Sequence, residues 1–138
     1  MLQRLNFSGL ELLVDRILDS LPDSVWNDPA VRFLDPDVGC GRGIFARAVE
    51  GRLRKYGHSD ENISARVYGY TSEPIIKNFL VTRYSLVGNY EVKNFLEEEI
   101  NMDFDVILGN PPYQHPTNKR WKLWVQFITK SLDHLEEG

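Results

Sequence analysis

The stretch from residue 104 to residue 113 constrains the fold of this chain more than any other. Val106–Leu108 is an apolar run without polar alternation, which is typical of a strand covered on both faces. Two prolines follow closely, and because proline has no backbone N–H to donate, the strand must end near Gly109. The sequence therefore places Asn110 and Tyr113 in a stiff loop at the carboxyl end of a strand, where open α/β sheets bind ligands.

The composition excludes several classes of protein. The chain has 138 residues, of which 42% are hydrophobic and 26% charged, as expected for one globular domain with its own core. No apolar run approaches the ~20 residues that span a bilayer, and the N-terminus does not resemble a signal peptide. The only cysteine is Cys40, so an internal disulfide is impossible and a cytoplasmic location is expected. The net charge of −4 does not indicate a self-sufficient nucleic-acid binder.

Helical and strand patterns alternate along the chain. Ser8 is expected to cap the first helix, with Glu11 completing a capping box, and the segment 23–29 reads as a loop. The alternation predicts an α/β fold: a Rossmann-like sheet of about four parallel strands joined by right-handed crossovers. The predicted helices cover Ser8–Leu21, Ile44–Tyr56, a segment that opens at Pro74, and Lys119–Leu135; the predicted strands are Val31–Asp35, Ala65–Tyr70, Tyr90–Val92 and the strand that begins at Phe104.

A glycine-rich turn joins the first strand to its helix. Glycines at positions 39, 41 and 43 let the backbone approach a ligand closely. The turn lacks a lysine followed by serine or threonine, so it is not a P-loop. It contains Asp35 and Asp37 instead, and these acidic groups favour a ligand with a cationic end or with hydroxyls over a phosphate.

The tetrapeptide Asn110-Pro111-Pro112-Tyr113 resembles the catalytic motif of S-adenosylmethionine-dependent amino-methyltransferases, most closely the DNA adenine-N6 enzymes. The cytosine-N4 enzymes usually begin this motif with Ser or Asp. The resemblance implies that the Asn110 side-chain oxygen and the Pro111 carbonyl accept hydrogen bonds from the target amine. It further implies that the two prolines stiffen the loop and that Tyr113 stacks on a base turned out of the duplex. Methyl transfer of this kind requires no metal.

The same resemblance assigns the cofactor, S-adenosylmethionine, to positions spread along the chain. The glycine turn fits the family in two ways, one anchored on Asp35-Pro36 and one on Asp37, and both keep Gly41; we prefer Asp35 because it directly ends an apolar strand. The second strand departs from the family, since Thr71 stands where an acidic residue usually binds the ribose, and a carboxylate follows only at Glu73. The implied cofactor-binding residues are Ser8, Asp35, Pro36, Asp37, Gly39, Cys40, Gly41, Thr71, Glu73, Asn94 and Phe95.

The resemblance covers nearly the whole chain but not the whole family domain. In family order the strands would run third, second, first, fourth, which leaves the fourth strand as an open edge. We therefore expect residues 1–138 to form one partial methyltransferase domain that lacks the C-terminal strands and a target-recognition domain. Such a chain would need a missing region or a second chain to recognise DNA, or would form a homo-oligomer through the open edge.

Three functions agree with these motifs. The first is methylation of adenine N6 in DNA, of the restriction–modification or phage type, which the closeness of the N-terminal helix to the glycine turn favours. Lys119, Arg120 and Lys122 follow the catalytic motif and could meet a phosphate backbone. The second is glutamine-N5 methylation of a protein, since those enzymes use the same tetrapeptide on a side-chain amide. The third is a remnant that keeps the fold without catalysis.

Overall fold

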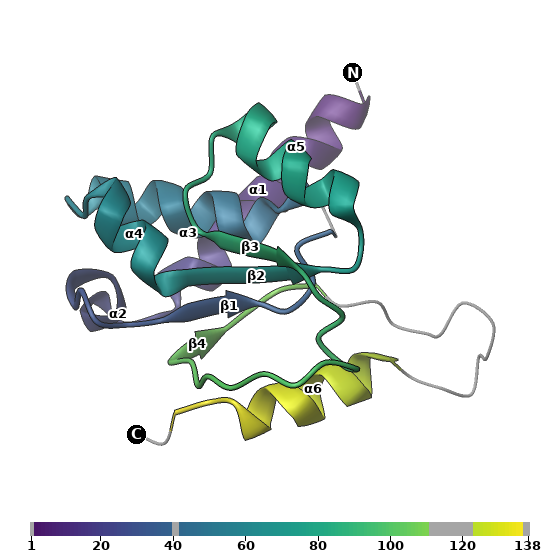
Figure 1. Ribbon diagram of the computed structural model, residues 1–138. Coiled ribbons are helices and arrows are strands. Elements are labelled where there is room, and N and C mark those ends of the chain that lie inside the picture. The colour runs from purple at the N-terminus through teal and green to yellow at the C-terminus, as the bar shows by residue number, and fades with distance from the viewer. Residues whose placement is uncertain (1, 40–41, 111–122, 137–138) are drawn as a thin grey trace.

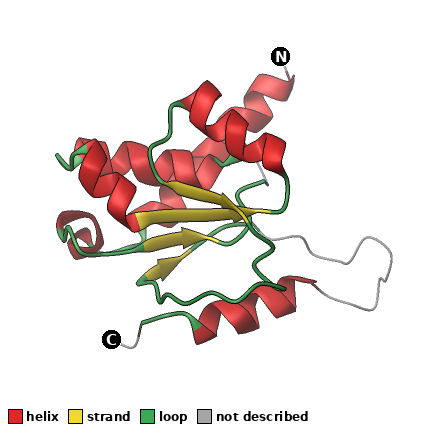
Figure 2. Ribbon diagram, in the orientation of Figure 1, coloured by secondary structure: helices red, strands yellow, loops and turns green. Residues whose placement is uncertain are grey.

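The computed structural model describes residues 2–39, 42–110 and 123–136, and these fold into a parallel sheet flanked by helices (Figures 1 and 2). The elements are α1 (Leu2–Asp19), α2 (Asp23–Asn27), β1 (Phe33–Asp35), α3 (Ile44–Lys55), α4 (Asp60–Arg66), β2 (Val67–Thr71), α5 (Pro74–Tyr84), β3 (Asn89–Val92), β4 (Val106–Ile107) and α6 (Leu123–Asp133). Among the described residues, none of the helices is long and apolar enough to cross a membrane.

The four strands are all parallel and lie in the order β3-β2-β1-β4. Phe33 of β1 lies beside Val67 of β2 on one side and Val106 of β4 on the other. This confirms the predicted α/β class and the predicted strand order. Because all strands run the same way, their carboxyl ends meet at one edge of the sheet, and that edge carries the candidate site.

The two faces of the sheet bury different clusters of side chains. One face packs against α1, α3, α4 and α5, with Trp26 stacked on Phe33 at 5.4 Å between ring centroids. The other face packs against α6 and the segment before β4, through Leu34, Phe95, Phe104 and Phe127. In β4 itself, Val106 joins the first cluster and Ile107 the second, as expected for a strand covered on both faces.

A buried glutamate fixes the start of β3. Glu50 of α3 has no exposed surface, and its carboxylate accepts hydrogen bonds from the backbone N–H groups of Val87 (2.9 Å) and Gly88 (3.1 Å) and from the Tyr90 hydroxyl. Arg54 lies 3.6 Å from the same carboxylate. Three donors and a cation therefore compensate the desolvation of this charge, as a buried carboxylate requires.

The helix boundaries differ from the predictions in three places. Helix α1 begins at Leu2, so Ser8 lies inside the helix and the predicted N-cap there is wrong; no proline or glycine lies between Leu2 and Ser8 to stop the helix. Helix α2 lies in the segment predicted as a loop, where it buries Trp26. Helix α4 was not predicted, and the Ser59 side chain caps it by accepting a hydrogen bond from Asn62 N–H at 3.1 Å.

The outer side of the fourth strand is partly occupied by the chain itself. Phe104 forms a parallel bridge with Leu135: its N–H donates to the carbonyl of His134 (2.7 Å), and its own carbonyl accepts from Glu136 N–H (2.8 Å). Consequently Phe104 is not part of β4, which is shorter than predicted. The expectation of an entirely uncovered edge is therefore wrong at Phe104.

Candidate active site

The carboxyl end of β1 contributes a buried carboxyl group. Asp35 is only 5% exposed, and its Oδ1 accepts a hydrogen bond from Asp37 N–H at 3.0 Å. Burial is the main cause that raises the pKa of Asp35 to about 8; the hydrogen bond from Asp37 N–H opposes this rise, and the negative charge of Asp37 contributes to it. A cationic group bound beside Asp35 would favour the charged carboxylate, so the electrostatics suit a positively charged ligand.

The glycine turn is fastened to the neighbouring strand. Val38 N–H donates to the carbonyl of Tyr70 in β2 (3.0 Å), and Gly43 N–H donates to the carbonyl of Val38 (2.9 Å). Gly43 has φ +70°, and a Cβ there would come within 2.4 Å of Leu80, so this position requires glycine. Cys40 and Gly41 lie outside the described residues, so their predicted cofactor contacts stay predictions.

Asp37, Thr71 and Glu73 form an acidic rim beside this turn. Asp37 Oδ1 accepts from Gly39 N–H at 3.3 Å, and the Thr71 hydroxyl oxygen accepts from Glu73 N–H at 3.1 Å. Partial burial raises the pKa of Asp37, and the nearby charge of Glu73 adds to this, while the Gly39 hydrogen bond opposes it. Thr71 is buried, Asp37 is partly exposed and Glu73 is exposed, so Glu73 is the most accessible carboxylate of this rim.

The segment after β3 supplies Asn94 and Phe95. The Asn94 side-chain oxygen accepts from Leu96 N–H at 3.0 Å, so within the structure it supports the turn. Phe95 is 1% exposed and stacks on Tyr70 and Phe127, at 6.4 and 5.8 Å between centroids. Phe95 therefore lies in the core behind the edge, and its predicted contact with the cofactor stays a prediction.

The carboxyl end of β4 brings the start of the predicted catalytic motif to the same edge. A Cβ on Gly109 would stand 2.6 Å from Asp35 Oδ1 and 3.5 Å from Pro36 Cδ, so the two strand ends are in close contact. Asn110 follows directly and is exposed. Pro111, Pro112 and Tyr113 lie outside the described residues, as do Lys119, Arg120 and Lys122. The structure thus places Asn110 beside the predicted cofactor turn. The roles predicted for Pro111, Pro112 and Tyr113 stay predictions.

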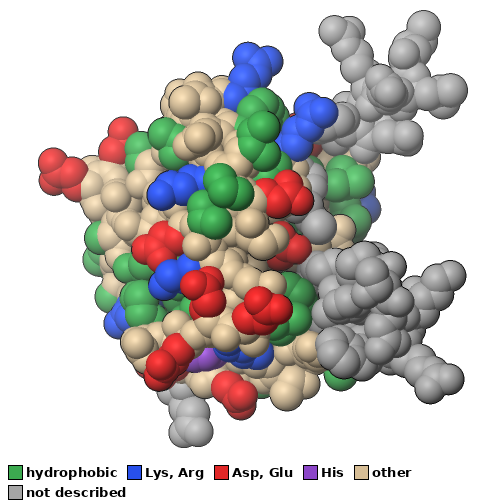
Figure 3. Space-filling model, turned by 45° about the vertical axis from the view of Figure 1, so that its right-hand side comes forward, with side chains coloured by type: hydrophobic (Ala, Val, Ile, Leu, Met, Phe, Trp, Pro, Cys, Tyr) green, Lys and Arg blue, Asp and Glu red, His purple; other side chains and the backbone are tan. Residues whose placement is uncertain are grey.

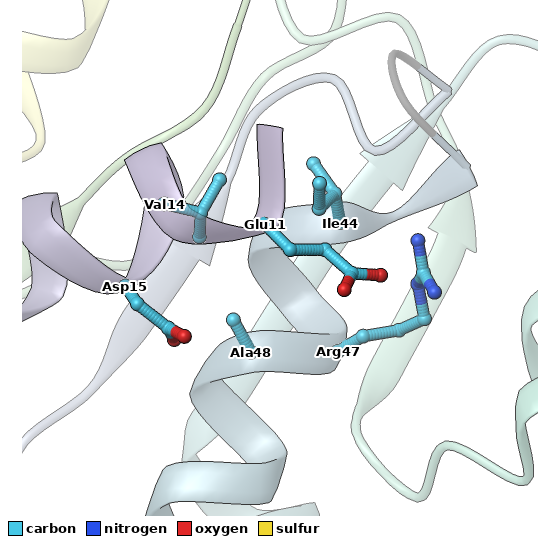
Figure 4. A pocket seen from close by; sticks show the side chains of 6 residues that line it. All are labelled: Glu11, Val14, Asp15, Ile44, Arg47 and Ala48. Atoms are coloured by element: carbon cyan, nitrogen blue, oxygen red, sulfur yellow. The ribbon is translucent and has the colours of Figure 1, made fainter. Parts of the chain in front are cut away.

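Helix α1 meets α3 just after the glycine turn. A hollow of about 230 Å³ between them is lined by Glu11, Val14, Asp15, Ile44, Arg47 and Ala48, and Figure 4 shows the Glu11 carboxylate extending toward Arg47. The Arg47 guanidinium also lies 4.2 Å from the ring centroid of Tyr84. Ser8 lies earlier in α1, and its side chain is outside the described part of the structure, so its predicted role stays a prediction.

The described side chains include no group of three or more His, Cys, Asp or Glu residues placed to hold a metal ion. At the edge, the carboxyl groups of Asp35 and Asp37 each accept a hydrogen bond from a backbone N–H. On the face drawn in Figure 3, the described acidic and basic side chains are interspersed.

Comparison with known proteins identifies the family of this chain. Residues 18–138 match the Methyltransferase small domain family, and the chain belongs to that family. One curated relative, a release factor glutamine methyltransferase from Agrobacterium fabrum (strain C58 / ATCC 33970), is 29% identical over 103 residues, which cover 75% of this chain and 33% of the relative. The chain therefore spans about a third of that protein's length.

Family membership implies S-adenosylmethionine as the methyl donor, as predicted. Family membership does not identify adenine in DNA as the methyl acceptor, which was the first of the three functions predicted from the sequence motifs.

Proposed function

We propose that this chain forms the cofactor-binding and catalytic part of an S-adenosylmethionine-dependent methyltransferase whose acceptor is the side-chain amide nitrogen of a glutamine in a protein. The observation that carries the proposal is the contact between the ends of β1 and β4, where Gly109 lies against Asp35 and sets Asn110 beside the glycine turn. The cofactor and the acceptor nitrogen would meet at this contact.

The chemistry explains why an asparagine stands there. An amide nitrogen is a poor nucleophile because its lone pair is delocalised into the carbonyl group. Acceptors such as the Asn110 side-chain oxygen and the Pro111 carbonyl would bind the N–H groups and favour a pyramidal nitrogen. Bound S-adenosylmethionine would supply the methyl group from its sulfonium, so that the new N–C bond would replace the S–C bond, leaving a neutral thioether and a nitrogen that can lose its proton. Fixed dipoles stabilise the positive charge that develops on the nitrogen.

Two features support glutamine over adenine as the acceptor. The relative named above acts, by its description, on glutamine in a release factor. The net charge of −4 also gives no general attraction to nucleic acid. Adenine N6 in DNA remains the second candidate, because Lys119, Arg120 and Lys122 follow the catalytic motif and Tyr113 offers a ring for base stacking.

A methyl-transfer assay tests the proposal. The chain is incubated with S-adenosylmethionine labelled in its methyl group and either a release factor or duplex DNA, and the label in each macromolecule is counted. We expect label in the release factor. Label in DNA alone would contradict the proposal and identify adenine N6 as the acceptor. Calorimetry with S-adenosylhomocysteine supplies the binding measurement, and a chain that binds no cofactor would be the non-catalytic remnant.

Asn110→Ala identifies the catalytic group within that assay. We expect transfer to fall by at least ~100-fold, the scale seen when one preorganised hydrogen-bonding group is removed. Binding of S-adenosylhomocysteine should persist. Asn101→Ala, at another exposed asparagine, is the matched control and should leave transfer unchanged. Transfer that survives Asn110→Ala would contradict the assigned chemistry.

Self-association through the β4 edge stays a separate prediction, which light scattering can test.

A further inference from the structure

The turn from Asn94 to Glu98 is closed by its own side chains. Asn94 Oδ1 accepts from Leu96 N–H, and Glu98 Oε2 accepts from Asn94 N–H at 2.7 Å. The Asn94 carbonyl accepts from the N–H groups of Glu97 (3.2 Å) and Glu98 (3.0 Å). The turn is therefore a compact unit that can be held in place by one or two outside contacts.

The turn lies at the ligand-binding edge of the sheet. Lys93 N–H, directly before it, donates to the carbonyl of Thr71 at 2.8 Å, which continues the pairing of β3 with β2. The Thr71 hydroxyl in turn accepts from Glu73 N–H, and a Cβ on Gly39 would lie 3.7 Å from Thr71 Oγ1 and 3.3 Å from Asp37 Oδ1. A displacement of the turn would therefore alter the rim at which the cofactor is proposed to bind.

Helix α6 holds this turn through one cation. Lys130 Nζ donates to the Glu98 carbonyl at 2.6 Å and lies 5.1 Å from the ring centroid of Phe95. The Phe95 ring is itself stacked on Phe127 of the same helix. Lys130 thus contacts the turn near its start, at the Phe95 ring, and at its last residue, at the Glu98 carbonyl. Helix α6, which carries Lys130, follows the proposed catalytic motif in the sequence.

We infer that Lys130 is a positioning residue for cofactor binding: it fixes the Asn94–Glu98 turn against α6 and so completes the rim of the cofactor site. The inference rests on the proposed function, because it assigns the cofactor to this edge. A hydrogen bond from a charged donor to a backbone carbonyl is stronger than a neutral one, and the ring contact adds a cation–π attraction. Lys130 does not touch the reacting atoms and acts only through the turn.

Three variants of the full chain test this role by calorimetry with S-adenosylhomocysteine. Lys130→Met keeps the length of the side chain and removes the donor, and we expect the dissociation constant to rise about tenfold, as for the loss of one charge-assisted hydrogen bond. Lys130→Arg retains a donor and should recover most of the affinity. Lys55→Met, at an exposed lysine in the last turn of α3, is the matched control and should bind as wild type does. In a transfer assay, Lys130→Met should raise KM for S-adenosylmethionine with little change in kcat.

Hydrogen exchange separates positioning from general stability. In Lys130→Met without cofactor, the amides of Leu96 and Glu98 should exchange about tenfold faster, while those of β1 and β2 keep their protection. Unchanged exchange in the turn, or wild-type affinity in Lys130→Met, would overturn the inference and leave the proposed function standing. A wild-type chain that binds no S-adenosylhomocysteine would overturn both.

Discussion

Gly109 lies directly against the carboxyl group of Asp35, so close that a Cβ on the glycine would stand 2.6 Å from Asp35 Oδ1. Gly109 lies two residues after the end of β4, and Asp35 is the last residue of β1, which pairs with β4. Asp35 cannot move away without loss, because the same oxygen accepts the Asp37 N–H. The position of Asn110 therefore depends on glycine at 109.

Gly109→Ala should impair both the fold and the reaction. The added methyl group must displace either the Asp35 carboxyl or the end of β4, and overpacking of this kind costs about 1–3 kcal/mol of unfolding free energy. Because Asn110 follows directly, we also expect methyl transfer to fall more than tenfold. Urea unfolding measures the first effect and the labelled-methyl assay the second.

Gly51→Ala is the control for this substitution. Gly51 lies within α3, and a Cβ there would meet no atom within 4 Å. Alanine in place of glycine in this helix interior should stabilise the chain by up to ~1 kcal/mol.

A double mutant tests whether Asp35 causes the cost of Gly109→Ala. In the Asp35→Ala background, Gly109→Ala should cost less unfolding free energy than it does in wild type, since the carboxyl group that the new methyl group meets is gone. Equal costs in the two backgrounds would show that the contact does not limit this position.

Asp35→Asn should change how stability depends on pH. Burial raises the pKa of Asp35 from 3.8 to about 8, so the folded protein binds this proton more tightly than the unfolded chain does. The resulting stabilisation is complete below pH 3.8 and is lost as the pH rises toward 8. Asparagine does not titrate and keeps an oxygen for the Asp37 N–H. Relative to Asp35→Asn, wild type should therefore lose stability with rising pH, by at most about 1.4 kcal/mol per pH unit.

The measurement is urea unfolding of both proteins at several pH values between 4 and 8, with the difference in unfolding free energy plotted against pH. Asp133→Asn replaces an exposed carboxyl on α6 and should follow wild type throughout. A difference between wild type and Asp35→Asn that stays flat, or that grows in favour of wild type as the pH rises, would refute the assignment of a buried protonated Asp35.

The main helices and strands were accessible from sequence because they depend on local patterns, whereas the order of the strands came from the family resemblance. The apolar run before Gly109, the glycines after Asp35 and the proline that opens α5 each act within a few residues of themselves. Helix α4 was missed because its sequence, DENISAR, has no apolar periodicity. It is held instead by distant contacts, such as Arg66 donating to the carbonyls of Asp28 (2.7 Å) and Val31 (3.1 Å).

The contacts that shape the site could not be predicted from sequence either, because they join residues that are far apart along the chain. Nothing local to Gly109 shows that Asp35 lies against it, and nothing near Lys130 shows that its amine reaches Glu98. A weak signal did exist for Glu50, which stands one residue after Val49 on the buried side of α3. A carboxylate in that position indicates buried donors, although not which ones.

Glu73→Gln tests which group replaces the acidic residue expected at the end of β2. Glu73 is exposed and its charge acts on Asp37, so we expect it to bind the ribose hydroxyls of the cofactor. Loss of that charge should weaken binding of S-adenosylhomocysteine about tenfold, the scale of one charge-assisted hydrogen bond. Thr71→Val removes the buried hydroxyl at nearly constant volume and should have the smaller effect on the dissociation constant. The reverse order in calorimetry would assign the ribose to Thr71.

Tyr90→Phe tests how far the buried carboxylate of Glu50 stabilises the sheet. The substitution removes one of three donors to Glu50 and leaves the N–H groups of Val87 and Gly88 in place. Burial, and secondly the charge of Glu50, raise the pKa of the Tyr90 hydroxyl, so it stays a donor across the accessible pH range. We expect a loss of about 1–3 kcal/mol in unfolding free energy, because a buried charge loses a partner.

Glu50→Ala should cost more, about 3–5 kcal/mol, since it removes the acceptor of all three donors and leaves a cavity. Tyr56→Phe is the matched control: Tyr56 is 41% exposed, and its hydroxyl bonds only the exposed Asp23 among the contacts described, at 3.3 Å. Its unfolding free energy should stay within ~0.5 kcal/mol of wild type. If Tyr90→Phe is as mild as Tyr56→Phe in urea unfolding, the Tyr90 hydroxyl contributes little, and the two backbone N–H groups suffice to hold the carboxylate that fixes β3.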